Sequence, residues 1–121
     1  MEVRIEPQTH HVRVVVKGEF DPAAARAGVV SIVAACRELG VDAVLIDGRG
    51  ITSPISVLDR YEIAKALADE ARRRLRLAIV VTRENMTSKT FEETAVNMGM
   101  EVRTTESMAE ALTYLELPLS K

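Results

Sequence analysis

The residues best placed to do chemistry lie in one short stretch, residues 45–56, which read LIDGRGITSPIS. The stretch runs from the end of an apolar strand, through a predicted tight turn bracketed by Gly48 and Gly50, into the start of a long helix. Chemistry in open α/β sheets collects at such corners, because strand ends and helix N-termini turn polar groups toward a crevice. The stretch holds no nucleophile–base pair, metal cluster or complete phosphate loop. It therefore predicts recognition or modification rather than catalysis.

Three hydroxyl residues, Thr52, Ser53 and Ser56, lie near the predicted start of this helix. A phosphate added there would meet free N–H groups and a favourable helix macrodipole. Ser53 is followed by Pro54, which fits an N-cap residue and a first helical residue. A capping serine can also be a switch. We therefore predict Ser53 as the N-cap and all three residues as candidates for modification or docking.

A crevice for a small anion is the second candidate site. Asp47 and Arg49 end the central strand, while Arg83 and Lys89 follow the next strand and flank a helix predicted to start at Thr87. The carboxyl ends of neighbouring parallel strands share one edge of a sheet, so these side chains are expected near one another. An ordinary solvated loop is the alternative interpretation of the same residues.

Other reactive residues indicate no catalytic or metal site. Gly48 and Gly50 resemble the start of a dinucleotide fingerprint, but Ser53 stands where its third glycine belongs. His10 and His11 are adjacent in a predicted strand, so they would point to opposite faces and share no metal. Cys36 lies in an apolar helical pattern and is interpreted as a structural thiol. We expect no catalytic residue, cofactor or metal.

Composition predicts one globular domain over residues 1–121. The chain is 47% hydrophobic and 28% charged, as expected for a packed core and not for a disordered segment. A net charge of −2 and an aromatic content of 3% disfavour nucleic acid as a partner. One cysteine, no leader pattern and no long apolar run predict a cytoplasmic protein without a membrane span.

Apolar spacing predicts the element order ββαβαβαβα. This order requires right-handed crossovers and gives a mixed, mostly parallel five-stranded sheet with four helices, in which strand 41–47 is interior. Asp21 is predicted to cap the first helix, and Gly40 and Gly99 to end the first and third. Helical spacing turns Leu58 and Tyr61 of the second helix inward. The strands are expected at 2–6, 10–17, 41–47, 75–82 and 101–104, and the helices at 22–39, 55–74, 87–98 and from Thr105 or Ser107 to before Pro118.

This element order resembles the STAS domain, the fold of bacterial anti-sigma-factor antagonists and of transporter C-terminal domains. Asp47, Gly50, Ile51 and Thr52 match the first half of the STAS corner motif. The second half of the motif is Asp-Ser-Ser-Gly in STAS domains, and a partner kinase phosphorylates its serine. In this sequence residues 55–58 occupy that place. Ser56 is kept, and Val57 stands at the usual phosphoserine position. Residues 93–99 and 109–115 are also similar to the subgroup of the sporulation stage II antagonist.

The resemblance implies a non-enzymatic regulatory or interaction module that acts by protein–protein contact, with a degenerate phosphoswitch corner. A kinase or an anti-sigma-type protein is the implied partner, with Ser56 or Ser53 the expected acceptor if a kinase modifies the chain. The alternative is a carrier or sensor that binds a small ligand or anion in the strand-end crevice. An enzyme with an unrecognised site is the third hypothesis.

The first helix carries more apolar surface than one sheet face needs. Val30, Val33 and Ala34 extend beyond the stripe formed by Val29 and Ile32. Surplus apolar surface of this kind commonly marks a contact surface. We therefore predict packing against a second copy or a partner protein through Val30 and Val33, with burial inside the monomer as the competing interpretation.

Overall fold

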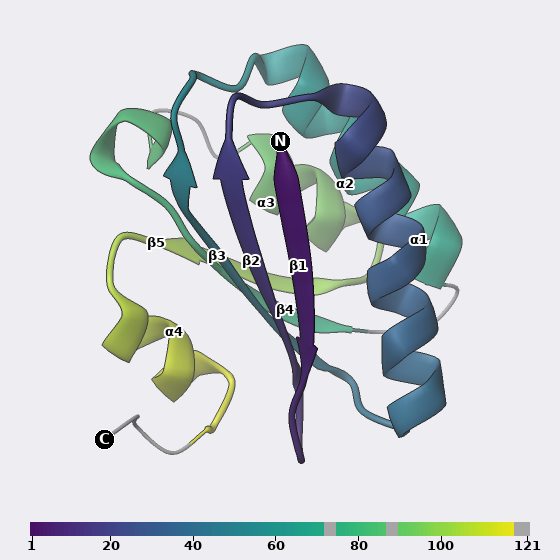
Figure 1. Cartoon of the computed structure of the whole chain (residues 1–121). Helices are drawn as coiled ribbons and strands as arrows, with labels where there is room; N and C mark the ends of the chain where they lie inside the picture. Colours follow the sequence, from purple (N-terminus) through teal and green to yellow (C-terminus); the bar gives the residue numbers. More distant parts are fainter. Residues whose placement is uncertain (72–74, 87–89, 118–121) are drawn as a thin grey trace.

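Five strands form one sheet in the part of the chain that the computed structural model describes, residues 1–71, 75–86 and 90–117. β1 pairs with β2 in antiparallel fashion, and the remaining neighbours pair in parallel, so the predicted mixed sheet is confirmed (Figure 1). The central position belongs to β3, as predicted from its apolar run. The strand order is β1 (Glu2–Pro7), β2 (Val12–Gly18), β3 (Ala43–Ile51), β4 (Arg76–Val80) and β5 (Glu101–Thr105).

The helices cover the two sheet faces unequally. α1 (Pro22–Leu39), α2 (Val57–Ala71) and α3 (Thr90–Asn97) pack on one face, around a core that includes Val12, Val44 and Leu77. On the opposite face, α4 (Met108–Tyr114) packs over Leu45 and Ala78 (Figure 1). A short 3₁₀ helix, η1 (Arg83–Met86), follows β4 and was not predicted. None of the described helices combines the length and apolar character needed to span a membrane.

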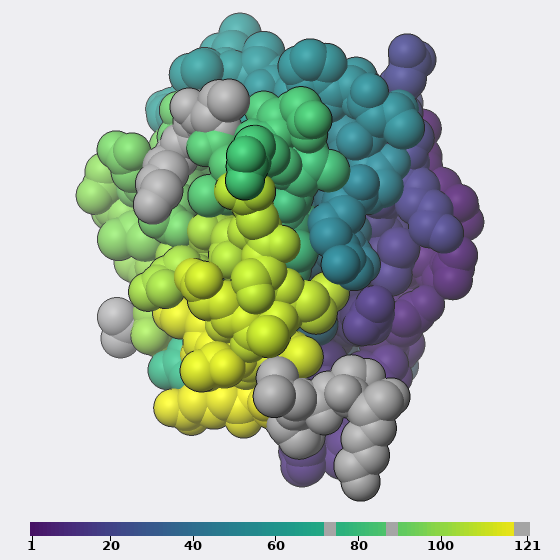
Figure 2. All heavy atoms as spheres, turned by 90° about the vertical axis from the view of Figure 1, so that its left-hand side faces the viewer, coloured from purple at the N-terminus to yellow at the C-terminus, as the bar shows by residue number. Residues whose placement is uncertain are grey.

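The β1–β2 half of the second face is not covered by α4. α4 contacts β4 and β5, and atoms of the N-terminal strands, coloured purple, lie beyond it in the space-filling view (Figure 2). Alternation along β1 and β2 sends Val12 and Val14 to the helix-covered face, where both are fully buried. The opposite positions, which include Glu6 and Arg13, are polar except for Val15, as expected for a half-solvated antiparallel ribbon.

The first helix has the caps that its sequence predicts. The Asp21 carboxylate accepts a hydrogen bond from the backbone N–H of Ala23 at 3.0 Å, and Pro22 is the first helical residue. Gly40 ends the helix with a φ of 69°, the left-handed conformation that glycine adopts without strain. At the other end of the chain, Ser107 caps α4 by accepting from the backbone N–H of Glu110 at 3.1 Å.

Several boundaries differ from the predicted ones. The hairpin turn spans residues 8–11, closed by the Gln8 N–H donating to His11 O at 2.9 Å, so His10 and His11 lie in the turn. Their placement on opposite faces of a strand was therefore wrong. The helix predicted over 55–74 begins at Val57, and the strand predicted over 75–82 is Arg76–Val80. Thr87 and Lys89 lie outside the described residues, and α3 begins at Thr90 in the described part.

The apolar surplus of α1 is buried inside the monomer at Val33. This side chain is 2% exposed, whereas Val30 is 53% exposed. The physical reason is that α2 lies beside α1 on the same sheet face, where Arg26 and Glu62 form an ion pair at 3.0 Å (Figure 1). The prediction that Val33 faces a second copy was wrong. A homodimer through the exposed Val30 stays a prediction.

We expect Val33→Ala to lower the free energy of unfolding by about 2 kcal/mol, because it removes two methyl groups from the packed core. Val30→Ala, on the exposed side of the same helix, should change it by less than about 0.5 kcal/mol. Urea denaturation of both variants measures the difference. Equal losses in the two variants would contradict the burial of Val33 within one monomer.

Candidate functional site

The corner after β3 is extended strand and not the tight turn that its glycines predicted. β3 continues to Ile51 and stays paired with β2 through Lys17 opposite Gly50 and Gly18 opposite Ile51, after a register shift that begins at Val15. The close approach of β2 to β3 leaves little room for a side chain at Gly50. A Cβ built on Gly50 would lie 2.9 Å from Lys17 Cγ. Gly48 and Gly50 therefore serve strand pairing, because neither has the positive φ of a turn glycine.

Thr52 and Ser53 attach the corner to the loop that follows β2. The Thr52 N–H donates to Gly18 O at 3.0 Å, and the Phe20 N–H donates to Ser53 Oγ at 2.8 Å. Ser53 is half-buried, and its hydroxyl does not cap α2, so the predicted N-cap was wrong. This hydrogen bond joins segments thirty-three residues apart in the sequence. A local sequence pattern cannot predict a partner at that distance.

Ser56 is the residue that caps α2. Its Oγ accepts from the backbone N–H of Asp59 at 3.1 Å, and its carbonyl oxygen accepts from the N–H of Arg60 at 3.0 Å. These are the hydrogen bonds of an N-cap residue followed by a helix that begins at Val57. Ser56 is also exposed, so of the three predicted hydroxyl residues it places its side chain both at the helix N-terminus and in solvent.

The first two turns of α2 are rotated relative to the predicted orientation. Arg60 points inward and is 8% exposed, whereas Leu58 and Tyr61, predicted to be inward, are 63% and 46% exposed. The buried positions of α2 are Arg60, Ala64, Leu67 and Ala71, a stripe at helical spacing that begins with an arginine. Sequence reasoning missed Arg60 because arginine is almost never fully buried without partners.

Neutral oxygens of Ile55 and Asn85 accept hydrogen bonds from the buried arginine. Arg60 Nε donates to Ile55 O at 3.0 Å and Nη1 donates to Asn85 O at 2.9 Å. Asn85, itself 3% exposed, also accepts from Arg60 Nη2 through its side-chain oxygen at 3.4 Å. Burial lowers the pKa of the Arg60 guanidinium. The arginine thereby connects the corner and α2 to η1.

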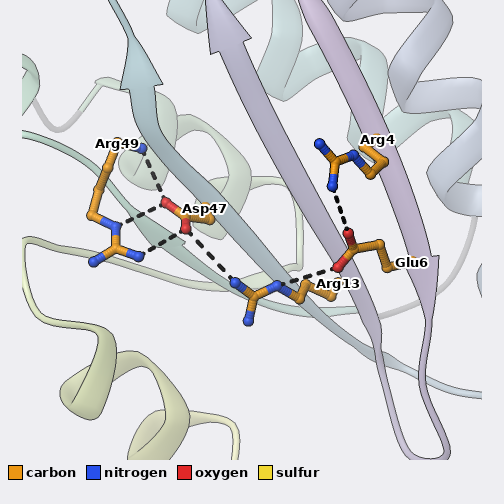
Figure 3. Close-up of polar contacts among 5 residues, drawn as sticks. All are labelled: Arg4, Glu6, Arg13, Asp47 and Arg49. Atoms are coloured by element: carbon orange, nitrogen blue, oxygen red, sulfur yellow. Dashed lines mark hydrogen bonds and ion pairs between the residues drawn. The ribbon is translucent and has the colours of Figure 1, made fainter. Parts of the chain in front are cut away.

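Asp47 belongs to a line of charges across β1, β2 and β3. Its carboxylate accepts from Arg49 Nε at 2.9 Å and from Arg49 Nη2 at 2.8 Å, and Arg13 Nη2 lies 3.8 Å away (Figure 3). The line continues from Arg13 to Glu6 at 3.5 Å and from Glu6 to Arg4 at 3.4 Å. The hydrogen bonds from the Arg49 side chain hold the pKa of the Asp47 carboxyl below its usual value, against the opposite effect of burial.

The predicted anion crevice carries its own counter-charges. Arg49 is paired with Asp47, and Arg83 lies 3.6 Å from Glu106. Across the described residues, no hydrogen bond or ion pair connects these two pairs, and Lys89 lies outside the part that the structure describes. Each arginine is neutralised locally, which lowers the attraction of the crevice for an anion. The crevice stays a prediction.

The reactive residues remain apart from one another. Cys36 is buried in the core of the helix-covered face at 1% exposure, while His10 and His11 lie in the hairpin turn. Within residues 1–71, 75–86 and 90–117, no group of three or more histidine, cysteine, aspartate or glutamate side chains is placed to hold a metal ion. The chemistry that the corner offers is therefore hydrogen bonding and apolar contact, with an exposed hydroxyl at Ser56.

Comparison with known proteins identifies the fold. No protein-family model matches the chain, and no curated protein matches it by sequence. Among solved structures it is similar to an anti-sigma factor antagonist from Mycobacterium paratuberculosis, with 21% identity and a TM-score of 0.58 over 95% of this chain and 93% of that one. It is also similar to the anti-sigma factor antagonist SpoIIAA in its unphosphorylated form, with 15% identity and a TM-score of 0.58 over 98% and 100%.

The chain has a STAS-like fold. The likeness covers nearly all of both chains, which agrees with the predicted element order. In this STAS-like chain, Asp47, Gly50, Ile51 and Thr52 occupy the end of β3 and the residue after it. Ser56 and Val57 then form the cap and first residue of α2.

We expect Asp47→Asn to lower the free energy of unfolding by about 1–2 kcal/mol at pH 7, because the variant loses charged hydrogen bonds to a half-exposed Arg49. The pKa of Asp47 is lowered in the folded state, so its contribution is complete above the usual value of 3.8. It disappears as the pH falls through the lower folded-state pKa. The difference between wild type and variant should therefore shrink only below pH 3.8, in denaturant titrations across pH.

Asp69→Asn, at an exposed position of α2, serves as the matched control and should change stability little. A difference between wild type and Asp47→Asn that persists unchanged to the lowest measurable pH would contradict the proposed origin in the ionised carboxylate.

Proposed function

We propose that the chain is a non-enzymatic regulatory module that acts by contact with another protein. The observation that carries the proposal is an apolar patch at the corner, formed by Val57, Leu58 and Tyr61 on the first turns of α2. Both solved structures to which the fold is similar are described as anti-sigma factor antagonists. An anti-sigma-type protein or its kinase is the partner class that this similarity suggests.

The geometry of the patch favours protein contact. Val57, Leu58 and Tyr61 are 59%, 63% and 46% exposed, which is unusual for large apolar side chains. Tyr61 lies four residues after Val57 and three after Leu58, so the three share one side of the helix. Aromatic residues within such patches commonly contribute most to binding at protein interfaces. Docking through this patch requires no movement of the buried stripe of α2.

Ser56 lies at the edge of the patch and supplies a means of regulation. Its hydroxyl is exposed, whereas the Ser53 hydroxyl is half-buried and accepts from the Phe20 N–H. A phosphate on Ser56 would be stabilised by the N-terminus of α2 but would place negative charge beside the apolar residues. Partner binding would then weaken, because the charge must be desolvated in the interface. Of the two predicted acceptor serines, we favour Ser56.

We include in this proposal that the chain has no enzymatic activity and that it is located in the cytoplasm. The corner residues are occupied by strand pairing, capping and ion pairs, and none is paired as a nucleophile with a base in the described part of the chain. A buried Cys36 suits a reducing compartment.

We expect Leu58→Ser to weaken binding to the partner at least about tenfold, because an exposed apolar contact is lost from the centre of the patch. Leu39→Ser, at the 43% exposed end of α1, is the matched control and should bind as the wild type does. Isothermal titration calorimetry with purified anti-sigma-type proteins encoded beside the gene measures both affinities. Equal binding by both variants would place the interface elsewhere.

We expect a kinase of the anti-sigma-type partner class to phosphorylate Ser56. Mass spectrometry of the chain after incubation with kinase and ATP should locate one phosphate there. Ser56→Ala should abolish it, whereas Ser53→Ala should leave it in place. Stoichiometric phosphate on Ser53, on Thr52 or elsewhere would overturn the assignment to Ser56.

A further inference from the structure

An apolar cavity lies between the sheet and the helices that cover it, on the inner side of the corner. Its volume is about 150 Å³. Four strands and three helices contribute apolar side chains to its wall. These include Val14 of β2, Ile46 of β3, Ile79 of β4, Ile32 of α1, Ile63 of α2 and Phe91 of α3.

Small residues keep this cavity open. Ala25 and Gly28 of α1 and Gly48 of β3 all line it, where larger side chains would occupy the space. A Cβ on Gly48 would lie 3.3 Å from Val80 O and 3.4 Å from Ile51 Cδ1, so the wall is already close around this position. The cavity is partly open to the protein surface, so a small molecule can enter it from solvent.

Water is a poor occupant of the cavity. A buried water needs two to four polar partners. Asp59, Arg60, Asn85 and Thr104 are the polar residues of the wall, and Arg60 donates to the backbone and side-chain oxygens of Asn85. Throughout the described residues, no buried side-chain nitrogen or oxygen lacks a hydrogen-bond partner. The wall therefore offers an occupant apolar contact and little opportunity for new hydrogen bonds.

We propose that this cavity is a binding site for a small, neutral, apolar molecule the size of a monocyclic aromatic ring. A dry cavity of about 150 Å³ lined by aliphatic and aromatic side chains accommodates benzene in another protein. Dispersion contact with the isoleucine, valine and phenylalanine side chains supplies the affinity. The site lies on the helix-covered face, opposite the face that carries Asp47. It is therefore separate from the predicted anion crevice.

Benzene is the probe for the test, with the full-length chain in solution. Benzene should raise the melting temperature by about 2–4 °C at saturation. In methyl NMR spectra it should shift the signals of Ile46, Ile63 and Ile79. A crystal exposed to xenon gas should show xenon density between the sheet and α1. These readouts are independent of any protein partner, so they can fail while the proposed regulatory function holds.

A filling variant links the binding to this cavity. Ala25→Leu should place a larger side chain in the space and weaken benzene binding at least about tenfold. Ala34→Leu, on an exposed position of α1, is the matched control and should bind benzene as the wild type does. If Ala25→Leu does not fold, the xenon site in the wild-type crystal decides. No methyl shifts and no xenon density, or benzene-induced shifts confined to Val57, Leu58 and Tyr61, would overturn the proposal.

Discussion

The close approach of β2 and β3 at Gly50 is the constraint on which the corner depends. A Cβ at this position would lie 2.9 Å from Lys17 Cγ and 3.0 Å from Val16 O, so a larger residue would force β2 to shift where it pairs with β3. The chain then leaves the sheet beside the loop that starts α1, where Thr52 and Ser53 bond to Gly18 and Phe20. The starts of α1 and α2 are thereby fixed relative to one strand edge. The exposed apolar patch of α2 consequently has a defined place in the fold.

The unequal covering of the sheet explains why the two faces differ in chemistry. Three helices exclude water from one face, which is packed with aliphatic side chains. On the other face α4 covers β4 and β5, and charged residues cross the open part from Arg4 to Arg49 (Figure 3). Half-exposed ion pairs of this kind each contribute little to stability. Asp47 is the exception, because its 12% exposed side chain is held by Arg49 on one side and Arg13 on the other. Alternating charges also leave the face without a strong attraction for anions.

Local patterns predicted the element order, the central strand and the caps at Asp21 and Gly40, and gave Ser107 as one of two possible starts of the last helix, because these depend on residues close in sequence. The errors arose at residues whose contacts or burial depend on a segment distant in the sequence. Ser53 was predicted as a cap, but its hydroxyl accepts from the Phe20 N–H in the loop between β2 and α1. Val33 was predicted to be surplus surface, but it is buried in the core of the face where α1 packs beside α2. The rotation of α2 was unforeseen because Arg60 occupies an inward position that sequence alone assigns to an apolar residue.

Opposite sides of the first turns of α2 carry residues of the two proposals, the apolar cavity inside and the apolar patch outside. The two proposed sites are therefore connected through this helix. The inner side carries Arg60 and borders the apolar cavity, while the outer side carries Leu58 and Tyr61. Arg60 bonds to the carbonyl oxygens of Ile55 and Asn85, so a shift of these turns must disturb the corner and η1 together. A molecule in the cavity that stabilised this arrangement would favour the conformation that a partner meets on the outside. Linkage is reciprocal, so the partner would tighten binding of that molecule by the same factor.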